Sequence, residues 1–163
     1  MTLEERVEQL EARLRQAEDR LEIIDLLNRY GPLADSGSSQ EAAALWIEGG
    51  GYNYSGGKSG GTRLEAPDQL VEIYDGDGHR GLMAAGCAHL TATPAITIDG
   101  DRATAIGYTF VILREEDRWF VFRAAINDFS LVRTDDGWRI SERYNRTLTG
   151  SEESHEVMKR VLG

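Results

Sequence analysis

The second half of the chain is a series of β-rich segments separated by short turn signals, and this pattern most restricts the folds open to it. The segments cover 91–98, 103–113, 119–133 and 138–147, and the turns between them include Asp99-Gly100-Asp101. Helical patterns occupy the first half instead, over the first thirty residues, 40–46 and 66–74, and a helix or tail is expected over 151–162. Helices followed by consecutive hairpin-linked strands predict an α+β fold with an antiparallel meander.

Small residues interrupt the two longest predicted strands. Ala103, Ala105 and Gly107 fall in one strand, and Ala124 and Ala125 fall in the next. Such residues within long strands suit a strongly curved sheet, because they allow bends and close backbone approaches.

A heptad pattern marks residues 1–24. Apolar residues recur there at alternating steps of four and three, at Leu3, Val7, Leu10, Leu14, Ala17, Leu21 and Ile24. Thr2 and Glu5 form a capping-box signature at the start of this helix. The narrow apolar stripe fits packing on a partner helix, on the chain's own domain or on another subunit, and Gly31-Pro32 is expected to end or kink the helix.

Length and charge exclude several classes of protein. The 163 residues suit a single domain over 1–163, with 1–24 as its heptad-patterned helical extension. The net charge of −10 argues against nucleic acid or an anionic membrane as a partner, since phosphate binding depends on Lys and Arg. Cys87 is the only cysteine, so no intramolecular disulfide forms. With no apolar leader and no run of 18 apolar residues, we expect a soluble, cytoplasmic protein.

Three apparent motifs lack the context that their chemistry needs. The glycines at 76, 78 and 81 match a dinucleotide-binding pattern, but a predicted helix precedes them where a strand is required, so we expect a loop. Gly57-Lys58-Ser59 resembles part of a phosphate-binding loop without its upstream glycine. The three histidines lie far apart without ligand-like spacing, so no metal site is predicted.

Asp35 and His89 are the candidates for acid–base chemistry. An imidazole titrates near neutrality and serves as a general base, and a carboxylate on its other nitrogen fixes the tautomer and raises its basicity. Taken alone, Asp35 is better interpreted as a turn or capping residue before Ser36-Gly37, and His89 as a hydrogen-bonded strand residue, and the sequence by itself does not bring the two together.

The order of several short segments resembles the SnoaL-like branch of the nuclear transport factor 2-like superfamily. The matching features, over roughly residues 18–150, are Tyr30 and Asp35, Trp46 before a glycine-rich segment, Cys87-Ala88-His89, the block 96–103, and Asp136-Gly137-Trp138-Arg139-Ile140. The resemblance implies a cone-shaped, curved antiparallel sheet wrapped around N-terminal helices, an α+β barrel with a pocket at its wide end. Enzymes of the superfamily include scytalone dehydratase and bile acid 7α-dehydratase, and the latter is the nearer resemblance.

The resemblance also implies a site. Asp35 and His89 fall on the positions of an Asp–His dyad in which histidine removes a proton, and Tyr30 falls on a catalytic tyrosine. Tyr54, Trp46 and Tyr108 become candidates for substrate binding. The second histidine that scytalone dehydratase uses has no counterpart in the pattern. No cofactor is implied, and the relatives favour a homo-oligomer, a trimer ahead of a dimer.

Polar residues on the last two strands are further candidates. Asn127 and Asp128 are adjacent, so only one of them points inward, and we favour Asn127 as the substrate-binding residue. Arg143 and Arg146 compete in the same way for a substrate-binding role, and a one-residue shift in register decides between them. We take Arg146 as the candidate.

Two functions follow from this reading. One is a cofactor-independent lyase or isomerase that eliminates water from an apolar cyclic or polycyclic small molecule by the dyad. The alternative is a non-catalytic small-molecule-binding or protein-interaction module of the same fold.

Overall fold

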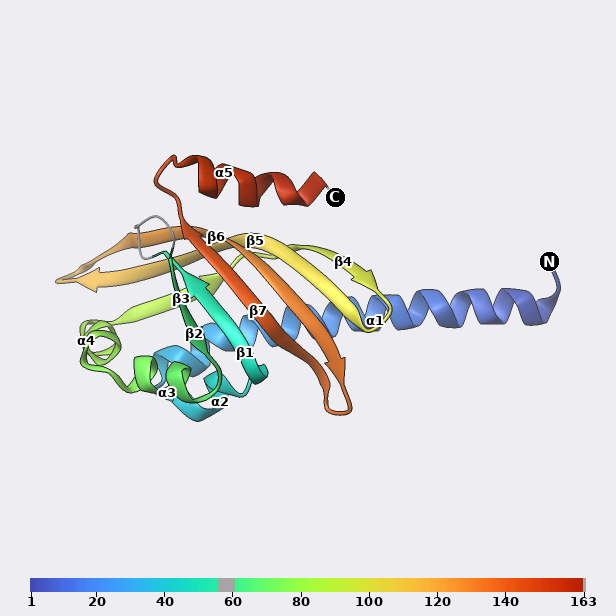
Figure 1. Ribbon diagram of the computed structural model, residues 1–163, viewed down its shortest axis with the longest axis horizontal. Helices are drawn as coiled ribbons and strands as arrows, with labels where there is room; N and C mark the ends of the chain where they lie inside the picture. The colour runs from blue at the N-terminus through green and yellow to red at the C-terminus, as the bar shows by residue number, and fades with distance from the viewer. Residues whose placement is uncertain (56–60, 163) are drawn as a thin grey trace.

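The computed structural model describes residues 1–55 and 61–162, with most of its helices in the first half of the chain and its longest strands in the second half (Figure 1). Gly57-Lys58-Ser59 therefore lies outside the described residues. Within them, no helix combines the length and apolar character needed to cross a membrane. The elements are α1 (Leu3–Asp35), α2 (Ser39–Ala43), β1 (Trp46–Tyr54), β2 (Thr62–Glu65), α3 (Asp68–Asp75), α4 (Asp77–Ala85), β3 (Cys87–Thr91), β4 (Ala95–Asp99), β5 (Arg102–Glu115), β6 (Arg118–Thr134), β7 (Gly137–Thr147), α5 (Glu152–Lys159) and a 3₁₀ turn (Arg160–Leu162).

The strands form one curved, open sheet in the order β2-β1-β7-β6-β5-β3, with β4 also paired to β5. Register shifts at Val111/Ile112 and Ser130/Leu131 mark irregularities in the two longest pairings, where a bulge adds bend and twist. The α+β fold with a curved sheet is confirmed. Two details differ from the prediction: the sheet does not close into a barrel, and β1 pairs with β7 in parallel.

The glycine-rich segment after α2 is a strand. Helix α2 ends at Ala43, so Trp46, predicted to be helical, begins β1. Glycines interrupt the alternation of apolar residues in β1, so the sequence pattern of a strand is weak there. At Gly50 a glycine is required by space, because a Cβ would lie 3.0 Å from the Ile47 carbonyl oxygen and 3.2 Å from that of Ile140. Pairing with β7 therefore stabilises β1 as a strand, although the local sequence of β1 does not predict one.

Two further boundaries correct the sequence prediction. The segment with glycines at 76, 78 and 81, expected to be a loop, forms the start of α4 directly after α3. Its helix propensity is low, and the helix depends on tertiary contacts, including a 2.9 Å hydrogen bond between His79 Nε2 and the Ala34 carbonyl. The predicted strand 91–98 is two strands, β3 and β4, separated by 92–94.

Helix α1 does not end at Gly31-Pro32. It continues to Asp35 with Pro32 inside its last turn, and the Pro32 carbonyl accepts a 3.0 Å hydrogen bond from the Ser36 N–H. Proline removes only its own N–H, so near the end of a helix the loss is a single hydrogen bond. The helix therefore carries Asp35 one turn further than the sequence predicts.

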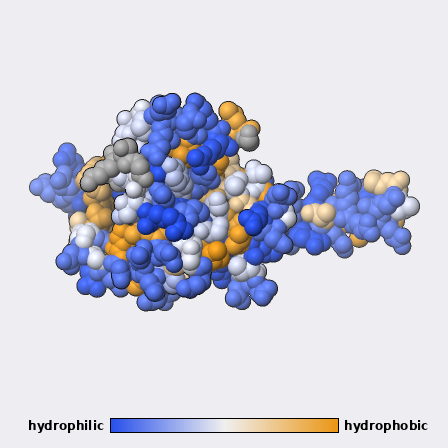
Figure 2. Space-filling view, in the orientation of Figure 1, coloured by the Kyte–Doolittle hydropathy of each residue, from blue (hydrophilic) through white to orange (hydrophobic). Residues whose placement is uncertain are grey.

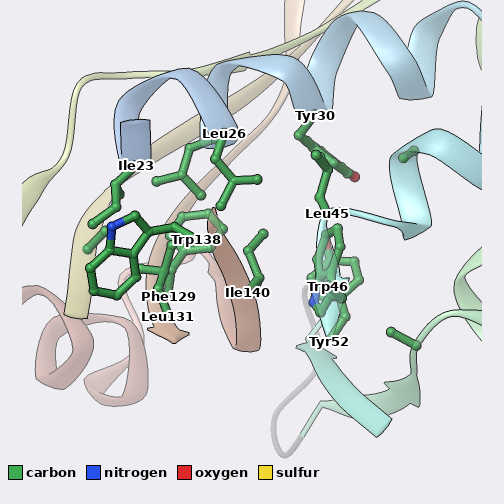
Figure 3. Packing of buried hydrophobic residues seen from close by; sticks show 14 of the residues in the cluster. Ile23, Leu26, Tyr30, Leu45, Trp46, Tyr52, Phe129, Leu131, Trp138 and Ile140 are labelled. Atoms are coloured by element: carbon green, nitrogen blue, oxygen red, sulfur yellow. The ribbon is translucent and has the colours of Figure 1, made fainter. Parts of the chain in front are cut away.

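The core lies between α1 and the concave face of the sheet. Ile23 and Leu26 of α1 pack on Leu131, Trp138 and other strand residues, as Figure 3 shows. On the other face of the sheet, α5 covers a smaller cluster around Val157. Figure 1 shows α1 and α5 on opposite sides of the sheet, with α2, α3 and α4 gathered near one end of it.

An ion pair fastens the middle of α1 to β6 and β7. Arg133 donates two 2.7 Å hydrogen bonds to the Asp19 carboxylate, which also accepts one of 3.2 Å from the Trp138 indole. The hydrogen bonds from Arg133, with a smaller contribution from Trp138, outweigh burial and lower the pKa of Asp19. These contacts of Asp19 mark the point where α1 first packs on the body of the protein, since all residues before Asp19 are exposed.

Asp19→Asn should destabilise the fold by about 1–3 kcal/mol at pH 7, because the variant leaves Arg133 and Trp138 poorly paired. The folded-state pKa of Asp19 is lowered, so its contribution is full above the unfolded value of about 3.9 and is lost as the pH falls through the folded value. Urea unfolding from pH 7 down to pH 2 measures this. A difference between variant and wild type that stays constant with pH would contradict it.

Candidate active site

Asp35 and His89 are in direct contact. Asp35 ends α1 and His89 lies in β3, and His89 Nδ1 is 2.5 Å from Asp35 Oδ1. The His89 backbone N–H also donates a 2.7 Å hydrogen bond to Asp35 Oδ2. With the carboxylate as acceptor, Nδ1 carries the proton and Nε2 is left as the basic nitrogen.

A third donor completes the environment of the Asp35 carboxylate. The Cys87 thiol donates a 3.1 Å hydrogen bond to Oδ1. Burial of Asp35 raises its pKa, but the bonds from His89 and Cys87 together outweigh burial, so the pKa lies below its usual value. The carboxylate is therefore charged at neutral pH. Burial and the adjacent carboxylate in turn raise the pKa of the Cys87 thiol to about 12.

Gly31 allows the helix to come this close to the strand. An ideal Cβ at Gly31 would lie 1.9 Å from the carbonyl oxygen of His89, which is far inside contact distance. Only glycine fits where the last turns of α1 rest on the backbone of β3. The Gly31-Pro32 pair thus belongs to the geometry that holds the two dyad residues together.

The dyad opens into a cavity of about 320 Å³, near the lower end of the ~300–1,000 Å³ typical of ligand sites. Its walls are mostly aromatic and apolar. The lining residues are Tyr30, Tyr52, Tyr54, Ile73, Tyr74, Gly76, Gly78, His79, Leu82, His89 and Arg123. A recess of about 10 Å³ shares Tyr30, Tyr52, His89 and Arg123 and is also lined by Arg143.

Arg143 is a buried cation without a counter-ion among the described residues. Its guanidinium lies 4.6 Å from the ring centres of both Tyr30 and Tyr52, and Nε donates a 2.9 Å hydrogen bond to Asn127 Oδ1. Its Nη1 is buried and has no hydrogen-bond partner in the described part of the chain. Burying a charge is costly unless it is paired. The aromatic rings compensate part of that cost, and the free Nη1 is available to a ligand oxygen.

Buried tyrosines supply neutral donors to the same cavity. Burial raises the pKa of Tyr52 and raises that of Tyr74 well above its usual value. Both phenols therefore keep their protons. The Tyr74 hydroxyl is buried with no hydrogen-bond partner within residues 1–55 and 61–162, so it too can serve a bound molecule.

The structure adds a histidine that the sequence pattern did not indicate. His79, on α4, lines the cavity, and its ring centre lies 5.5 Å from that of His89. The expectation of one histidine at the site is therefore corrected. Its position follows from α4, which the glycine-rich sequence did not predict, so spacing alone gave no signal for it.

The other predicted site residues divide between the two faces of the sheet. Tyr30 and Tyr54 line the cavity, whereas Trp46 packs against Tyr30 at 6.1 Å without lining it. Asn127 points inward as predicted, but it lines neither the cavity nor the recess and does not take the predicted substrate-binding position; it is fully buried and accepts a hydrogen bond from Arg143. Asp128 lies on the other face and pairs with Arg160 at 2.8 Å.

Arg146 and Tyr108 do not reach the cavity, which corrects their prediction as lining residues. Arg146 pairs with Glu153 of α5 at 2.6 Å and Tyr108 is 42% exposed. Both lie on the face opposite the cavity, since strand residues alternate in direction and the register places Arg143 inward. Arg143 takes the position first assigned to Arg146.

Asp35, Cys87 and His89 also form a set of potential metal ligands whose atoms lie within 4.8 Å of one another. The set is a poor fit to a cation. The thiol, with its pKa raised to about 12, keeps its proton and donates it to Asp35, and His89 Nδ1 faces the same carboxylate. The three groups satisfy one another as a hydrogen-bonded unit.

The sequence profile of the SnoaL-like domain matches residues 15–144 of this chain. The chain belongs to the SnoaL-like family. A solved NTF2-like protein with a cystatin-like fold from Novosphingobium aromaticivorans is 38% identical, and the match covers 91% of this chain and 94% of that one with a TM-score of 0.85.

More distant solved structures share the fold. A protein of unknown function from Mycobacterium tuberculosis is 21% identical over 91% of this chain and 89% of its own, with a TM-score of 0.72. A protein from Catenulispora acidiphila, in complex with S-DNPA, is 19% identical over 78% of this chain and 91% of its own, with a TM-score of 0.66. A comparison with curated proteins found no match.

Gly31→Ala should separate α1 from β3, because its Cβ would collide with the His89 carbonyl oxygen. We expect a loss of stability of about 1–3 kcal/mol, typical of overpacking, measured by urea unfolding. Gly81→Ala is the matched control, since a Cβ there meets nothing within 4 Å and alanine favours a helix. Equal stabilities for the two variants would contradict the close approach.

Proposed function

We propose that this protein is a cofactor-independent lyase or isomerase that removes a proton from a small cyclic substrate with the Asp35–His89 dyad. The observation that carries the proposal is the contact between the two residues at the wall of a mostly aromatic cavity. A charged carboxylate orients the imidazole and stabilises the imidazolium that forms. The SnoaL-like family, which includes dehydratases and isomerases, supports this class of reaction.

The reaction begins at a carbon next to a carbonyl. His89 Nε2 takes the proton, the C–H electron pair moves toward the carbonyl, and negative charge develops on its oxygen. Arg143, with its unpartnered Nη1, and the neutral tyrosine hydroxyls stabilise that charge. In an elimination, the enolate then expels hydroxide from the next carbon, and the imidazolium returns the proton so that water leaves.

The cavity favours a substrate of one or two rings. A volume of about 320 Å³ is small for a ligand site, and its walls are aromatic. Arg123 and Arg143 together favour a substrate that carries carbonyl oxygens or a negative charge. His79 donates its Nε2 hydrogen to the Ala34 carbonyl, so its Nδ1, close to His89, is left to accept a hydrogen bond from a substrate hydroxyl.

The alternative is a binding module of the same fold. The described complex of the Catenulispora acidiphila protein with S-DNPA supports small-molecule binding within this fold. Cytoplasmic location and a homo-oligomer, with a trimer ahead of a dimer, stay predictions.

Proton removal is testable without knowing the natural substrate. We expect the protein to accelerate hydrogen–deuterium exchange at the α-carbon of cyclic ketones such as 2-tetralone, followed by NMR in deuterated buffer. His89→Ala should lower the rate by about 10²–10⁴, and Asp35→Asn should lower it severely, because the base loses its orientation. His155→Ala, in an exposed position on α5, is the matched control and should leave the rate unchanged. Saturable binding of such ketones without exchange would favour the binding module.

Arg143→Met tests the proposed stabilisation of negative charge. Removing a buried donor aimed at the developing oxyanion should lower kcat for exchange by about 10²–10³. Arg146→Met is the control, since this equally buried arginine lies on the other face of the sheet. Equal losses in the two variants, per folded molecule, would show that Arg143 acts only through the fold.

A further inference from the structure

The N-terminal half of α1 projects from the body with an exposed apolar stripe. In the described chain, every residue before Asp19 is exposed, and Figure 2 shows this part of the helix standing clear of the body. The stripe residues Leu3, Val7, Leu10, Leu14 and Leu21 have exposures from 44% to 78%. A helix of this length without tertiary contacts is only marginally stable in water.

The stripe faces away from the chain's own body. The residues through which α1 packs on the sheet, such as Asp19, Ile23 and Leu26, are buried, whereas Leu21 between them is 63% exposed. In heptad terms the buried residues occupy positions f and c, opposite the a and d positions of the stripe. Ile24, the last d residue, packs against the core, so the free part of the stripe runs from Leu3 to Leu21. A partner helix can lie along that part without meeting the body.

Charges flank the stripe in a strict order. With Val7, Leu14 and Leu21 at position a, the e positions are all acidic and the g positions before the body are all basic. They are Glu4, Glu11, Glu18 and Asp25 at e, and Arg6, Arg13 and Arg20 at g. Among the described residues, none of these seven side chains forms an ion pair within the chain.

We infer that residues 3–24 form a parallel coiled coil with the same helix of a second copy of this chain. In a parallel pair, each g residue faces the e residue of the next heptad on the partner, so Arg6 meets Glu11, Arg13 meets Glu18 and Arg20 meets Asp25. An antiparallel pair instead places g against g and e against e, which sets arginine against arginine and acid against acid. The charges thus select both the partner and its orientation.

A single cysteine tests the pairing. Leu3 occupies a d position at the start of the helix, so Leu3→Cys side chains meet in a parallel pair, whereas an antiparallel pair separates them by about 30 Å, at 1.5 Å rise per residue over residues 3–24. In a glutathione redox buffer, we expect Leu3→Cys to form a covalent dimer in most molecules, and the wild-type chain to form none through Cys87.

Substitutions on the stripe then show whether the coiled coil causes the cross-link. Adding Leu10→Lys and Leu14→Lys should reduce the covalent dimer at least tenfold, because two charges enter the apolar seam. Adding Gln9→Lys and Gln16→Lys, which bring the same charge at c positions, should leave it unchanged. A Leu3→Cys chain that stays monomeric, or a cross-link insensitive to the seam lysines, would overturn the inference, as would pairing of the helix with another protein only.

Charge exchange tests the orientation independently. Arg13→Glu alone and Glu18→Arg alone should each raise, several-fold, the protein concentration at which half of the Leu3→Cys chain is cross-linked. The double exchange should restore the original value, because it recreates the pair with its signs reversed. A single exchange that leaves this concentration unchanged, or a double exchange that does not restore it, would contradict the proposal.

Discussion

The close approach of Gly31 to the backbone of His89 is the constraint on which the site depends. It lets the last turn of α1 rest directly on β3, so that Asp35 receives both the ring and the backbone N–H of His89. The continuation of α1 through Pro32 serves the same end, since a helix that stopped at Gly31 would leave Asp35 in a loop. Helix packing, and not a specialised loop, therefore sets the distance between the acid and the base.

The charge distribution around the cavity follows from that geometry. A charged carboxylate lies behind His89, and a buried guanidinium stacked on Tyr30 and Tyr52 lines the same recess as His89. The guanidinium donates a hydrogen bond to Asn127, and no described carboxylate neutralises its charge. A preorganised cation near a base suits the proposed proton abstraction next to a carbonyl, because negative charge develops on the carbonyl oxygen.

Sequence reasoning succeeded where local pattern and packing agree. The long alternating strands and the curved sheet were predictable, and alternation alone required Asn127 and Asp128 to face opposite ways. It failed where glycine obscures the pattern. Strand β1 and helix α4 both carry glycines that weaken local propensity, and pairing with β7 or packing around His79 decides their conformation. His79 was missed at the site for this reason.

The sequence could not decide between Arg143 and Arg146 either. Both lie on β7, and the register with β6 and the cover provided by α5 decide which one faces the recess beside His89. By itself, the sequence determined the α+β class, the heptad helix with its ordered charges, and the candidacy of Asp35 and His89, because these depend on periodicity and residue chemistry. Only the tertiary structure decided that Asp35 and His89 touch, which arginine joins them and how large the cavity is, because those properties depend on how distant segments pack.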